Sequence, residues 1–574
     1  MLAGRLNFLG QWFFGMIEEI KSIVTESLER VKENLGEEFQ APTIEITVPK
    51  NRDFGDYSTN VAMVLSNPLK RPPREIAELI VAGIPQGEPR LFKRVEVKGP
   101  GFVNFFINEQ ELSSRLIEIE SLGDEFGLSQ AGAGERVLVE YVSANPTGHL
   151  HMGHARNAAV GDTIANLLQS QGFSVAREFY INDSGRQIEM LGRSVLARYK
   201  QSFGLDAEIP LDGYFGEYIK ELAEEVKSEE GGRLLDADQD LALKLCRDYA
   251  KRRLLEVIKT TLGSFGVRFD EWYSEEERIT SSNAASGGAS LVDVVKEKLA
   301  QKGATYEKDG ALWFKASEFG GSQDWVLVKS DGSNTYFLND IAYHYDKIAR
   351  GFVRLINVWG ADHHGHVARL KAALRALGYD DSILEVVLIQ FVRLMREGHE
   401  VKMSKRAGSF VTMDEVLEEV GSDVARFFLL MRGQDSHLDF DLDLAKKESS
   451  ENPVFYVQYA NARIRSIFEK ARNNGYSPSK GSLHLLTTPI EVEIIKKLLA
   501  YPGVLEESAR LLAPHKVLFY LQDIASAFHV YYNKVRIIGE EPEITSARLF
   551  FVRCIQNVVR NGLGVLGVSV PERM

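Results

Sequence analysis

A pair of histidines stands where a buried strand gives way to a helix, and their spacing is the first in the chain to indicate chemistry. The apolar run Arg136 to Val142 (RVLVEYV) has the pattern of a buried strand, and the tetrapeptide HMGH (His151 to His154) precedes a helix with one apolar face. A helix N-terminus binds anions, and imidazoles beside it can donate hydrogen bonds to phosphate oxygens. Gly153 lets a phosphate or a planar nucleotide approach the backbone. Alone, HxGH is more often a pair of ordinary loop histidines.

A second motif, much later in the chain, places two lysines in a polar stretch punctuated by glycine. The stretch EGHEVKMSKRAGSF contains Lys402-Met403-Ser404-Lys405, and its composition predicts a mobile loop. Positioned cations stabilise charge on the transferred and departing phosphates of a nucleotidyl transfer without covalent participation. A KxxK loop by itself is usually solvated charge. The two motifs together, in this order, indicate a site for a nucleoside triphosphate.

Helical and strand periodicities define the elements that must position these motifs. Alternating strands and helices in the middle of the chain predict an α/β fold with a Rossmann-like parallel sheet. Helical patterning without strand alternation at the C-terminal end predicts an all-α bundle. The predicted boundaries are 1–15 for an extension of unknown role, 16–108 for an N-terminal α+β domain, 130–420 for the catalytic domain with an insertion at about 195–260, 421–450 for a connector, and 451–574 for the helical domain.

Composition limits the classes of protein that this chain can be. Its 574 residues, 44% of them hydrophobic, are enough for about three or four domains. Two cysteines are too few for a disulfide scaffold, which predicts a reducing, cytoplasmic location. No apolar run reaches the roughly 18 residues of a membrane span, so we expect no membrane association. A net charge of −13 argues against a uniformly basic nucleic-acid binder, although residues 451–574 hold 15 Lys and Arg against 11 Asp and Glu.

The two motifs resemble the HIGH and KMSKS sequences of the class I aminoacyl-tRNA synthetases, with Arg406 in place of the final serine. The resemblance implies ATP with Mg²⁺ and attack of an amino-acid carboxylate on the α-phosphate, a step that needs no general base because the nucleophile is already an anion. It implies catalytic roles for His151, His154, Lys402 and Lys405. The ATP-binding residues that it implies are His151, Gly153, His154, Gly360, Asp362, His363, Met403 and Ser404.

Further segments resemble the bacterial type of arginyl-tRNA synthetase, in that family's order. They are FGDYSTNVAMVL, SANPTGHLHMGHARN, FDEWYSE, TYFLNDIAYHYDK, GADHHGH and ENPVFYVQYANARIRSI. The resemblance implies an arginine–tRNA ligase that forms arginyl-adenylate and transfers the arginyl group to the 3′-terminal adenosine of tRNA(Arg). It also implies that tRNA binds before activation, and that the protein is a monomer.

The same resemblance assigns an arginine pocket. A guanidinium is planar, permanently charged and carries five donors, so a selective site needs carboxylates in a fork geometry and an aromatic group. Tyr336 and Asp340 are four residues apart and lie on one face if their segment is helical. The residues implied to bind arginine are Asn145, His151, Glu275, Tyr336, Asp340 and His364.

RNA contacts are expected in the C-terminal region, where unpaired bases can stack on aromatic side chains. The residues assigned to tRNA binding are Tyr456, Tyr459, Asn461, Arg463, Tyr532 and Arg536, with Arg465 and Tyr531 as further candidates. Many aromatic residues at helical spacing are simply core. No metal site is predicted, because Asp362, His363, His364 and His366 are spaced too closely to chelate one ion well.

Three other readings stay open at this point. One is a class I synthetase for another amino acid. A second is a different HxGH nucleotidyltransferase, such as a cofactor adenylyltransferase, although those are typically small and lack a helical appendage. A third is a synthetase-like RNA-binding protein without catalysis, which the retention of both histidines and both lysines disfavours.

Overall fold

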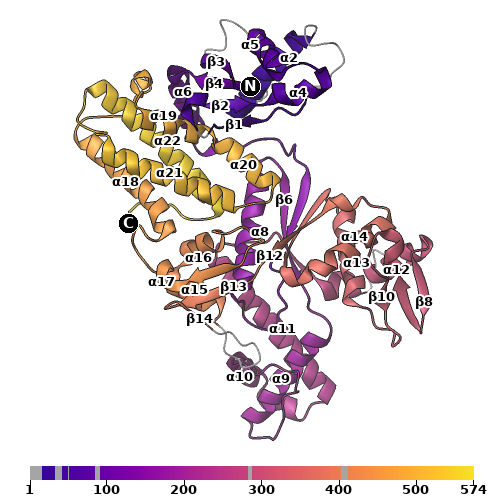
Figure 1. The fold of residues 1–574 in the computed structure, drawn as a ribbon. Coiled ribbons are helices and arrows are strands. Elements are labelled where there is room, and N and C mark those ends of the chain that lie inside the picture. Colours follow the sequence, from indigo (N-terminus) through magenta and orange to yellow (C-terminus); the bar gives the residue numbers. More distant parts are fainter. Residues whose placement is uncertain are drawn as a thin grey trace, which may run out of the picture.

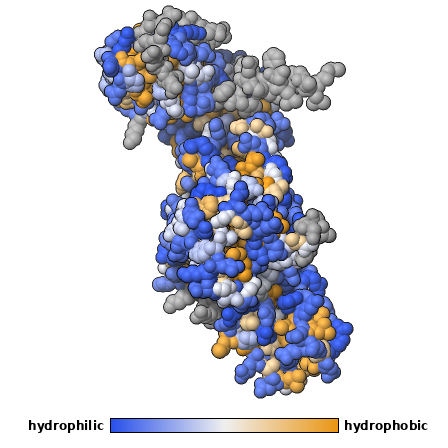
Figure 2. Space-filling view, turned by 90° about the vertical axis from the view of Figure 1, so that its right-hand side faces the viewer, coloured by the Kyte–Doolittle hydropathy of each residue, from blue (hydrophilic) through white to orange (hydrophobic). Residues whose placement is uncertain are grey.

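The computed structural model describes residues 16–32, 42–49, 51–84, 91–281, 288–401 and 411–573. The molecule is elongated, with the N-terminal region beside the C-terminal helices at one end and a group of helices, α9 to α11, at the other (Figure 1). The face displayed in Figure 2 is mostly hydrophilic, with apolar residues in scattered patches. None of the helices in the described ranges is long and apolar enough to cross a membrane.

The N-terminal region is an antiparallel sheet of order β1-β2-β4-β3 with three helices. Val24 and Leu28 of the first helix are buried, as are Ile76 and Ile80 of the third, because apolar residues recur at helical spacing in both. Two short helices then lead to the catalytic region. The elements are α2 (Met16–Arg30), β1 (Ile46–Thr47), β2 (Tyr57–Thr59), α4 (Val61–Leu69), α5 (Pro73–Gly83), β3 (Phe92–Lys98), β4 (Phe102–Ile107), α6 (Glu109–Ser114) and α7 (Leu116–Leu122).

Five parallel strands form the central sheet, in the order β12-β11-β5-β6-β7. Alternate residues of β5 enter different cores: Val137 and Val139 pack in the cluster that includes α8, whereas Leu138 packs with α13 and α14. Both faces of the sheet are therefore covered, as the α/β prediction requires. The elements are β5 (Arg136–Glu140), α8 (Met152–Ser170), β6 (Ser174–Ile181), β7 (Glu271–Ser274), α12 (Leu291–Gln301), α13 (Tyr336–Ala349), β11 (Arg354–Gly360), α14 (His364–Leu377) and β12 (Leu384–Ile389).

Two groups of elements interrupt the central sheet. Three helices, α9 (Arg186–Ser202), α10 (Glu217–Glu230) and α11 (Gln239–Ser264), pack around a hydrophobic cluster of their own. They begin before residue 195, where the charged helical pattern becomes obvious in the sequence. A small antiparallel sheet, β8 (Thr305–Lys308), β9 (Ala311–Phe314) and β10 (Trp325–Val328), lies between α12 and α13 along the chain.

The segment predicted as a connector contains its own helices and a strand that pairs with a strand earlier in the chain. Strand β15 (Leu438–Asp441) pairs in parallel with β13 (Val392–Arg396), which also pairs with β14 (His399–Glu400). Around it lie α15 (Met413–Val420), α16 (Ser422–Leu429) and α17 (Leu442–Ala445). The C-terminal bundle consists of α18 (Pro453–Asn473), α19 (Pro489–Leu499), α20 (Tyr501–Arg510), α21 (His515–Lys534) and α22 (Pro542–Leu566).

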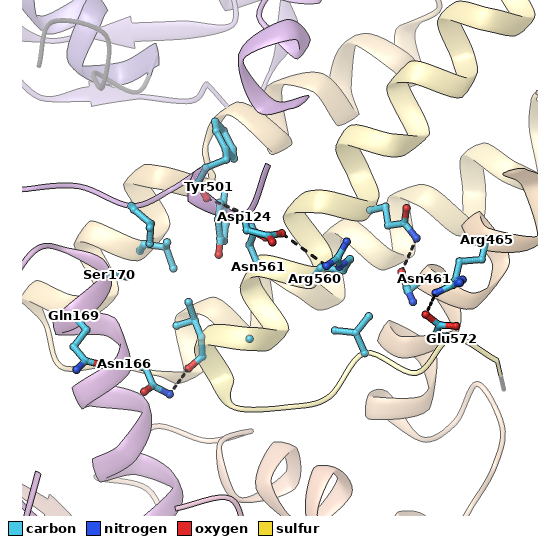
Figure 3. Close-up of a pocket in the computed structure, with 17 residues that line it drawn as sticks. Asp124, Asn166, Gln169, Ser170, Asn461, Arg465, Tyr501, Arg560, Asn561 and Glu572 are labelled. Atoms are coloured by element: carbon cyan, nitrogen blue, oxygen red, sulfur yellow. Dashed lines mark hydrogen bonds and ion pairs between the residues drawn. The ribbon is translucent and has the colours of Figure 1, made fainter. Parts of the chain in front are cut away.

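Helix α8 connects the central sheet to the bundle. The buried guanidinium of Arg426 in α16 forms an ion pair with Asp162 of α8 and donates a hydrogen bond to the carbonyl of Leu566 in α22. A cavity of about 700 Å³ opens between the C-terminal end of α8 and helices α18, α20 and α22 (Figure 3). It lies at the opposite end of α8 from the HMGH motif.

Candidate active site

The HMGH motif lies at the carboxyl edge of the parallel sheet, where the strand order reverses. The chain runs from β5 to β6 and β7 on one side, and β11 and β12 lie on the other side. Ligands of open α/β sheets bind in the crevice at such a switch point. The candidate crevice therefore lies between the junction of β5 and α8, which contains His151 to His154, and the end of β11 with the turn that follows it, Gly360 to His363.

The backbone between β5 and the motif is held in an unusual conformation. Val142 and Ser143 have positive φ angles of 66° and 41°, which is rare for a β-branched residue such as valine. Asn157 of α8 holds this turn, because its Oδ1 accepts from the N–H of Val142 at 2.7 Å while its Nδ2 donates to the carbonyl of Val358 in β11 at 2.8 Å. One side chain thus ties β5, α8 and β11 together at the crevice.

The two histidines cap helix α8. The Nδ1 of His151 accepts from the N–H of Gly153 at 3.1 Å, and the Nδ1 of His154 accepts from the N–H of His151 at 3.2 Å. Their rings stack with centroids 3.8 Å apart. Because Nδ1 accepts in both rings, each neutral imidazole carries its hydrogen on Nε2. Each Nε2 is therefore a donor at the positive end of the helix.

Residues after β11 line the other side of this crevice. The side chains of Asp362 and His363 are exposed by 68% and 58%, and Gly360 lies so close to Asp362 that a Cβ on it would be 2.5 Å from Oδ1. His363 packs against Trp359, with ring centroids 5.9 Å apart. His364 is exposed and begins α14. These polar groups lie at the same edge of the sheet as the histidine pair.

The lysine motif lies outside the described residues, so Lys402, Met403, Ser404, Lys405 and Arg406 have no described positions. The residues that follow them lie against the histidine motif. Thr412 forms an antiparallel bridge with His151, and the N–H of Met413 donates to the carbonyl of Leu150 at 2.8 Å.

A second polar pocket surrounds the carboxylate of Glu275, which is only 2% exposed. Tyr180 and Ser184 donate hydroxyl hydrogen bonds to it, and Asn339 donates from Nδ2 at 3.1 Å. Burial raises the pKa of Glu275, and the nearby carboxylates of Asp340 and Asp183 raise it further. A cation placed between Glu275 and Asp340 would therefore relieve the repulsion between them.

Helix α13 brings Tyr336 and Asp340 to this pocket, one turn apart, as their spacing predicts. Tyr336 is 56% exposed and reaches the loop before α9, since its hydroxyl would lie 3.7 Å from a Cβ on Gly185. Asn145, in the loop after β5, donates to Gln187 of α9 at 2.7 Å. Three of the residues predicted to bind arginine, Asn145, Glu275 and Tyr336, thus lie against the segment from Ser184 to Gln187, and Asp340 lies near Glu275.

Three residues of this pocket were not singled out from the sequence: Tyr180, Ser184 and Asn339, which hold Glu275. His366, which the sequence analysis considered only as a metal ligand, contacts Asp340 with Nε2 2.8 Å from Oδ2. Tyr180 and Ser184 lie at the end of β6 and in the turn that follows it. A polar turn at the carboxyl end of a parallel strand is the one signal that points to them.

The residues predicted to bind RNA divide into two groups. The guanidinium of Arg463 lies between the rings of Tyr459 and Tyr532, 4.6 and 4.5 Å from their centroids. Tyr456 joins this cluster through His529, with ring centroids 4.5 Å apart. Arg536 is exposed on the loop after α21.

Asn461 and Tyr531 differ from these surface groups because both are buried. Asn461 is 2% exposed, donates to the carbonyl of Pro571 at 2.9 Å and accepts from Gln556 at 2.8 Å. Tyr531 donates to the buried carboxylate of Glu491 at 3.1 Å. In this structure Asn461 holds the C-terminal segment, and it also lines the cavity shown in Figure 3.

No group of three or more His, Cys, Asp or Glu side chains arranged to hold a metal ion occurs in the part of the chain that the structure describes. Cys246 and Cys554 are both buried and free.

Comparison with known proteins shows three family models in succession along the chain. The arginyl tRNA synthetase N-terminal domain matches residues 18–107, the class I (R) tRNA synthetase catalytic domain matches 120–439, and the DALR anticodon binding domain matches 457–574. A curated relative, the arginine–tRNA ligase of Syntrophotalea carbinolica, is 46% identical and covers 95% of this chain and 100% of its own length. That of Geobacillus kaustophilus is also 46% identical, over 99% of this chain and 100% of its own.

Solved structures share the fold. The arginyl-tRNA synthetase of Thermus thermophilus superimposes with a TM-score of 0.75 at 24% identity, covering 97% of this chain and all of its own. The methionyl-tRNA synthetase of Mycobacterium tuberculosis, in complex with methionyl-adenylate, has a TM-score of 0.53 at 14% identity over 76% of this chain and 92% of its own.

A parallel sheet with HMGH at its switch point, matched over its whole span by one catalytic family model, is that of a class I aminoacyl-tRNA synthetase, a class whose members use ATP. The N-terminal and anticodon-binding matches and the near-full-length relatives narrow the class. The chain belongs to the arginyl-tRNA synthetase family, which confirms the family and the enzyme class predicted from the sequence.

Proposed function

We propose that this chain activates L-arginine with ATP to give arginyl-adenylate and pyrophosphate, and then transfers the arginyl group to the 3′-terminal adenosine of tRNA(Arg). The observation that carries the choice of arginine is the pair of carboxylates, Glu275 and Asp340, which lie close enough for Asp340 to raise the pKa of Glu275. Among the described residues the guanidinium of Arg369 interacts with Asp340, whereas the main influences on the pKa of Glu275 include no cation. A guanidinium satisfies both carboxylates, since it carries one delocalised charge and donors on two sides.

The side chain of arginine enters between Glu275 and Asp340, with Tyr336 covering the guanidinium from α13. Glu275 is a fixed acceptor because three donors hold it, whereas Asp340 is partly exposed and can meet the ligand from the open side. Asn145 and His151 lie on the β5 side and hold the α-amino and carboxylate ends. His364 completes the site from the start of α14.

ATP occupies the switch-point crevice. Gly153 allows the nucleotide to approach the backbone, the Nε2 donors of His151 and His154 stabilise the phosphate oxygens, and Gly360, Asp362 and His363 line the opposite wall. Lys402 and Lys405, with Met403 and Ser404, act on the triphosphate from the segment that ends near Thr412. The arginine carboxylate attacks the α-phosphorus, and the bond to the departing pyrophosphate breaks.

Mg²⁺ accompanies ATP in this proposal. Asp362 is the one carboxylate assigned to the crevice, and its side chain is exposed. The crevice therefore fits a Mg²⁺ ion that is coordinated mainly by phosphates and water. The ion would neutralise charge on the triphosphate, while this chain's imidazoles and lysines hold the phosphate oxygens.

Transfer RNA binds along the bundle. Tyr459, Arg463 and Tyr532 present a stacked cation and two rings, Tyr456 supports them through His529, and Arg536 offers a charge to the backbone. Asn461 contributes indirectly by holding the C-terminal segment. We further propose a cytoplasmic monomer; the two free cysteines agree with a reducing compartment.

Exchange of labelled pyrophosphate into ATP tests this function. The purified chain is assayed with each amino acid in turn, with and without tRNA(Arg). Exchange with arginine alone among the amino acids supports the proposal. Exchange with another amino acid would favour a different specificity within the class, and its absence with all of them would favour an RNA-binding role without catalysis.

A further inference from the structure

A buried histidine that has no role in the assignments above lies behind the arginine pocket. His366, in the first turns of α14, is 8% exposed, and its Nε2 lies 2.8 Å from Oδ2 of Asp340. The contact is short but not aligned as a hydrogen bond, so Nε2 has no hydrogen-bond partner among the described residues. Buried polar atoms are nearly always satisfied, and one without a partner beside a ligand site calls for a functional explanation.

Arg369 fixes the protonation pattern of this histidine. Its Nε donates to Nδ1 of His366 at 2.6 Å. A guanidinium has only donors, so Nδ1 must accept, and the neutral ring carries its hydrogen on Nε2. The hydrogen therefore lies on the nitrogen that faces Asp340.

Aromatic packing holds both groups in place. The ring of His366 lies 5.8 Å from Phe337 and 5.4 Å from Trp359, and the guanidinium of Arg369 lies 4.5 Å over Trp325. Neither side chain can turn away without losing these contacts. The donor on His366 is thus presented to Asp340 from a rigid support.

We propose that His366, oriented by Arg369, is a positioning residue that fixes the carboxylate of Asp340 for recognition of the arginine guanidinium. The inference rests on the proposed function, because it takes Asp340 as a ligand-binding group. When the guanidinium binds, Asp340 turns slightly and its Oδ2 accepts from Nε2 of His366. The carboxylate then offers its other oxygen in one direction, which suits a planar fork of donors better than a mobile ammonium.

The consequence is selectivity for arginine over lysine. A fixed carboxylate binds most tightly to a ligand whose donors match its geometry, whereas a carboxylate that is free to rotate can bind any cation. Loss of the His366 donor should therefore weaken the binding of arginine more than the binding of lysine.

Steady-state pyrophosphate exchange in the presence of tRNA, on the full chain, tests the inference. We compare His366→Phe, which retains a ring but no donor, with His366→Gln, whose amide can donate at a similar place. His366→Phe is expected to raise KM for arginine roughly ten- to hundredfold. KM for ATP should stay within about twofold, as a defect confined to the amino-acid pocket requires. His366→Gln should recover most of the loss, and His484→Phe, an exposed histidine of the bundle, serves as the matched control.

Thermal unfolding shows whether the His366→Phe protein is folded. If it is not, a third variant still tests the inference. Arg369→Met retains the packing stem but removes the donor to Nδ1, and it should raise KM for arginine by a smaller factor. An unchanged KM for arginine in the folded His366→Phe protein, or equal rises for arginine and ATP, would overturn the inference. Asp340→Asn distinguishes failure of the positioning role of His366 from failure of the proposed arginine pocket. If Asp340→Asn raises KM for arginine while the histidine variants do not, only the positioning role fails. If it has no effect either, the proposed pocket fails.

Discussion

His151 and Thr412 form an antiparallel bridge. The bridge joins the first residue of the HMGH motif to a residue that follows the lysine motif, although the two motifs lie far apart in the sequence. The bridge sits at the N-terminus of α8, where both histidine Nε2 atoms are donors. The lysine motif begins ten residues before Thr412, at Lys402. Thr412 and Met413, which follow the lysine motif, therefore lie at the proposed triphosphate site.

Substitution of Lys405 by alanine should remove a cation that acts on the triphosphate in the transition state. We expect kcat for pyrophosphate exchange to fall roughly a hundredfold or more, with KM for arginine nearly unchanged. Lys480→Ala, at an exposed position of the bundle, is the control and should keep full activity. A drop of less than threefold for Lys405→Ala would show that this lysine does not serve the adenylation step.

A methyl group at Gly153 should disturb the histidine cap. A Cβ there would lie 2.9 Å from Cε1 of His151, closer than such contacts are found, so the imidazole must shift. The expected result is about a tenfold lower kcat/KM for ATP. Gly503→Ala is the matched control, because a Cβ in that helix meets nothing within 4 Å. Equal activity of the two variants would contradict the assignment of this turn to ATP.

The affinity for arginine should depend on pH through Glu275. Burial, with repulsion from Asp340 and Asp183, raises the pKa of this carboxyl in the free protein. The guanidinium binds the ionised form, so a proton competes with arginine, and KM for arginine should rise as the pH falls through that raised pKa. It should level off at higher pH, where Glu275 is already ionised.

Glu275→Gln should bind arginine weakly and lose this dependence. Exchange assays at saturating ATP, across a pH range in which circular dichroism shows the fold intact, provide the measurement. A wild-type KM for arginine that stays flat over that range would contradict a binding role for the ionised Glu275.

Removal of Arg463 should weaken tRNA binding alone. Its guanidinium lies between Tyr459 and Tyr532, so Arg463→Ala loses the cation and loosens both rings. We expect KM for tRNA to rise about tenfold, with KM for arginine and ATP unchanged. Arg472→Ala, exposed at the end of the same helix, should have little effect in the aminoacylation assay. Parallel changes in all three KM values would indicate a fold defect instead.

Arg426 should be important for the stability of the junction between α8 and the bundle. Arg426→Met leaves Asp162 buried near one remaining cation, Arg177, whose Nε is 3.5 Å away, and leaves the carbonyl of Leu566 without this donor. The free energy of unfolding should fall by about 3 kcal/mol, measured by urea denaturation. Arg560→Met removes an exposed pair with Asp124 and should cost less than about 1 kcal/mol. Equal losses would show that burial of the Arg426 pair does not matter.

Local patterns were sufficient to predict the elements that carry the motifs. The apolar run before HMGH is strand β5, the helix after it is α8, and the four-residue spacing of Tyr336 and Asp340 is one turn of α13. Each of these depends on periodicity within a short segment.

Features that depend on distant contacts were not predicted. Strand β15 lies in a segment that was predicted as a connector, because its pairing partner β13 is some distance away along the chain. The support of Glu275 by Tyr180 and Ser184 crosses from β7 to the end of β6, and no spacing in the sequence encodes it. The assignment of Asn461 to tRNA binding stays a prediction, and the helical pattern of α18 does not reveal that this side chain is buried and donates to the carbonyl of Pro571.

Aminoacylation of purified tRNA(Arg) with labelled arginine, canavanine and lysine in parallel tests the central claim most directly. With ATP and Mg²⁺ present, we predict efficient charging with arginine, weaker charging with canavanine and none above background with lysine. Charging with lysine but not with arginine would contradict the assignment of Glu275 and Asp340 as the guanidinium site.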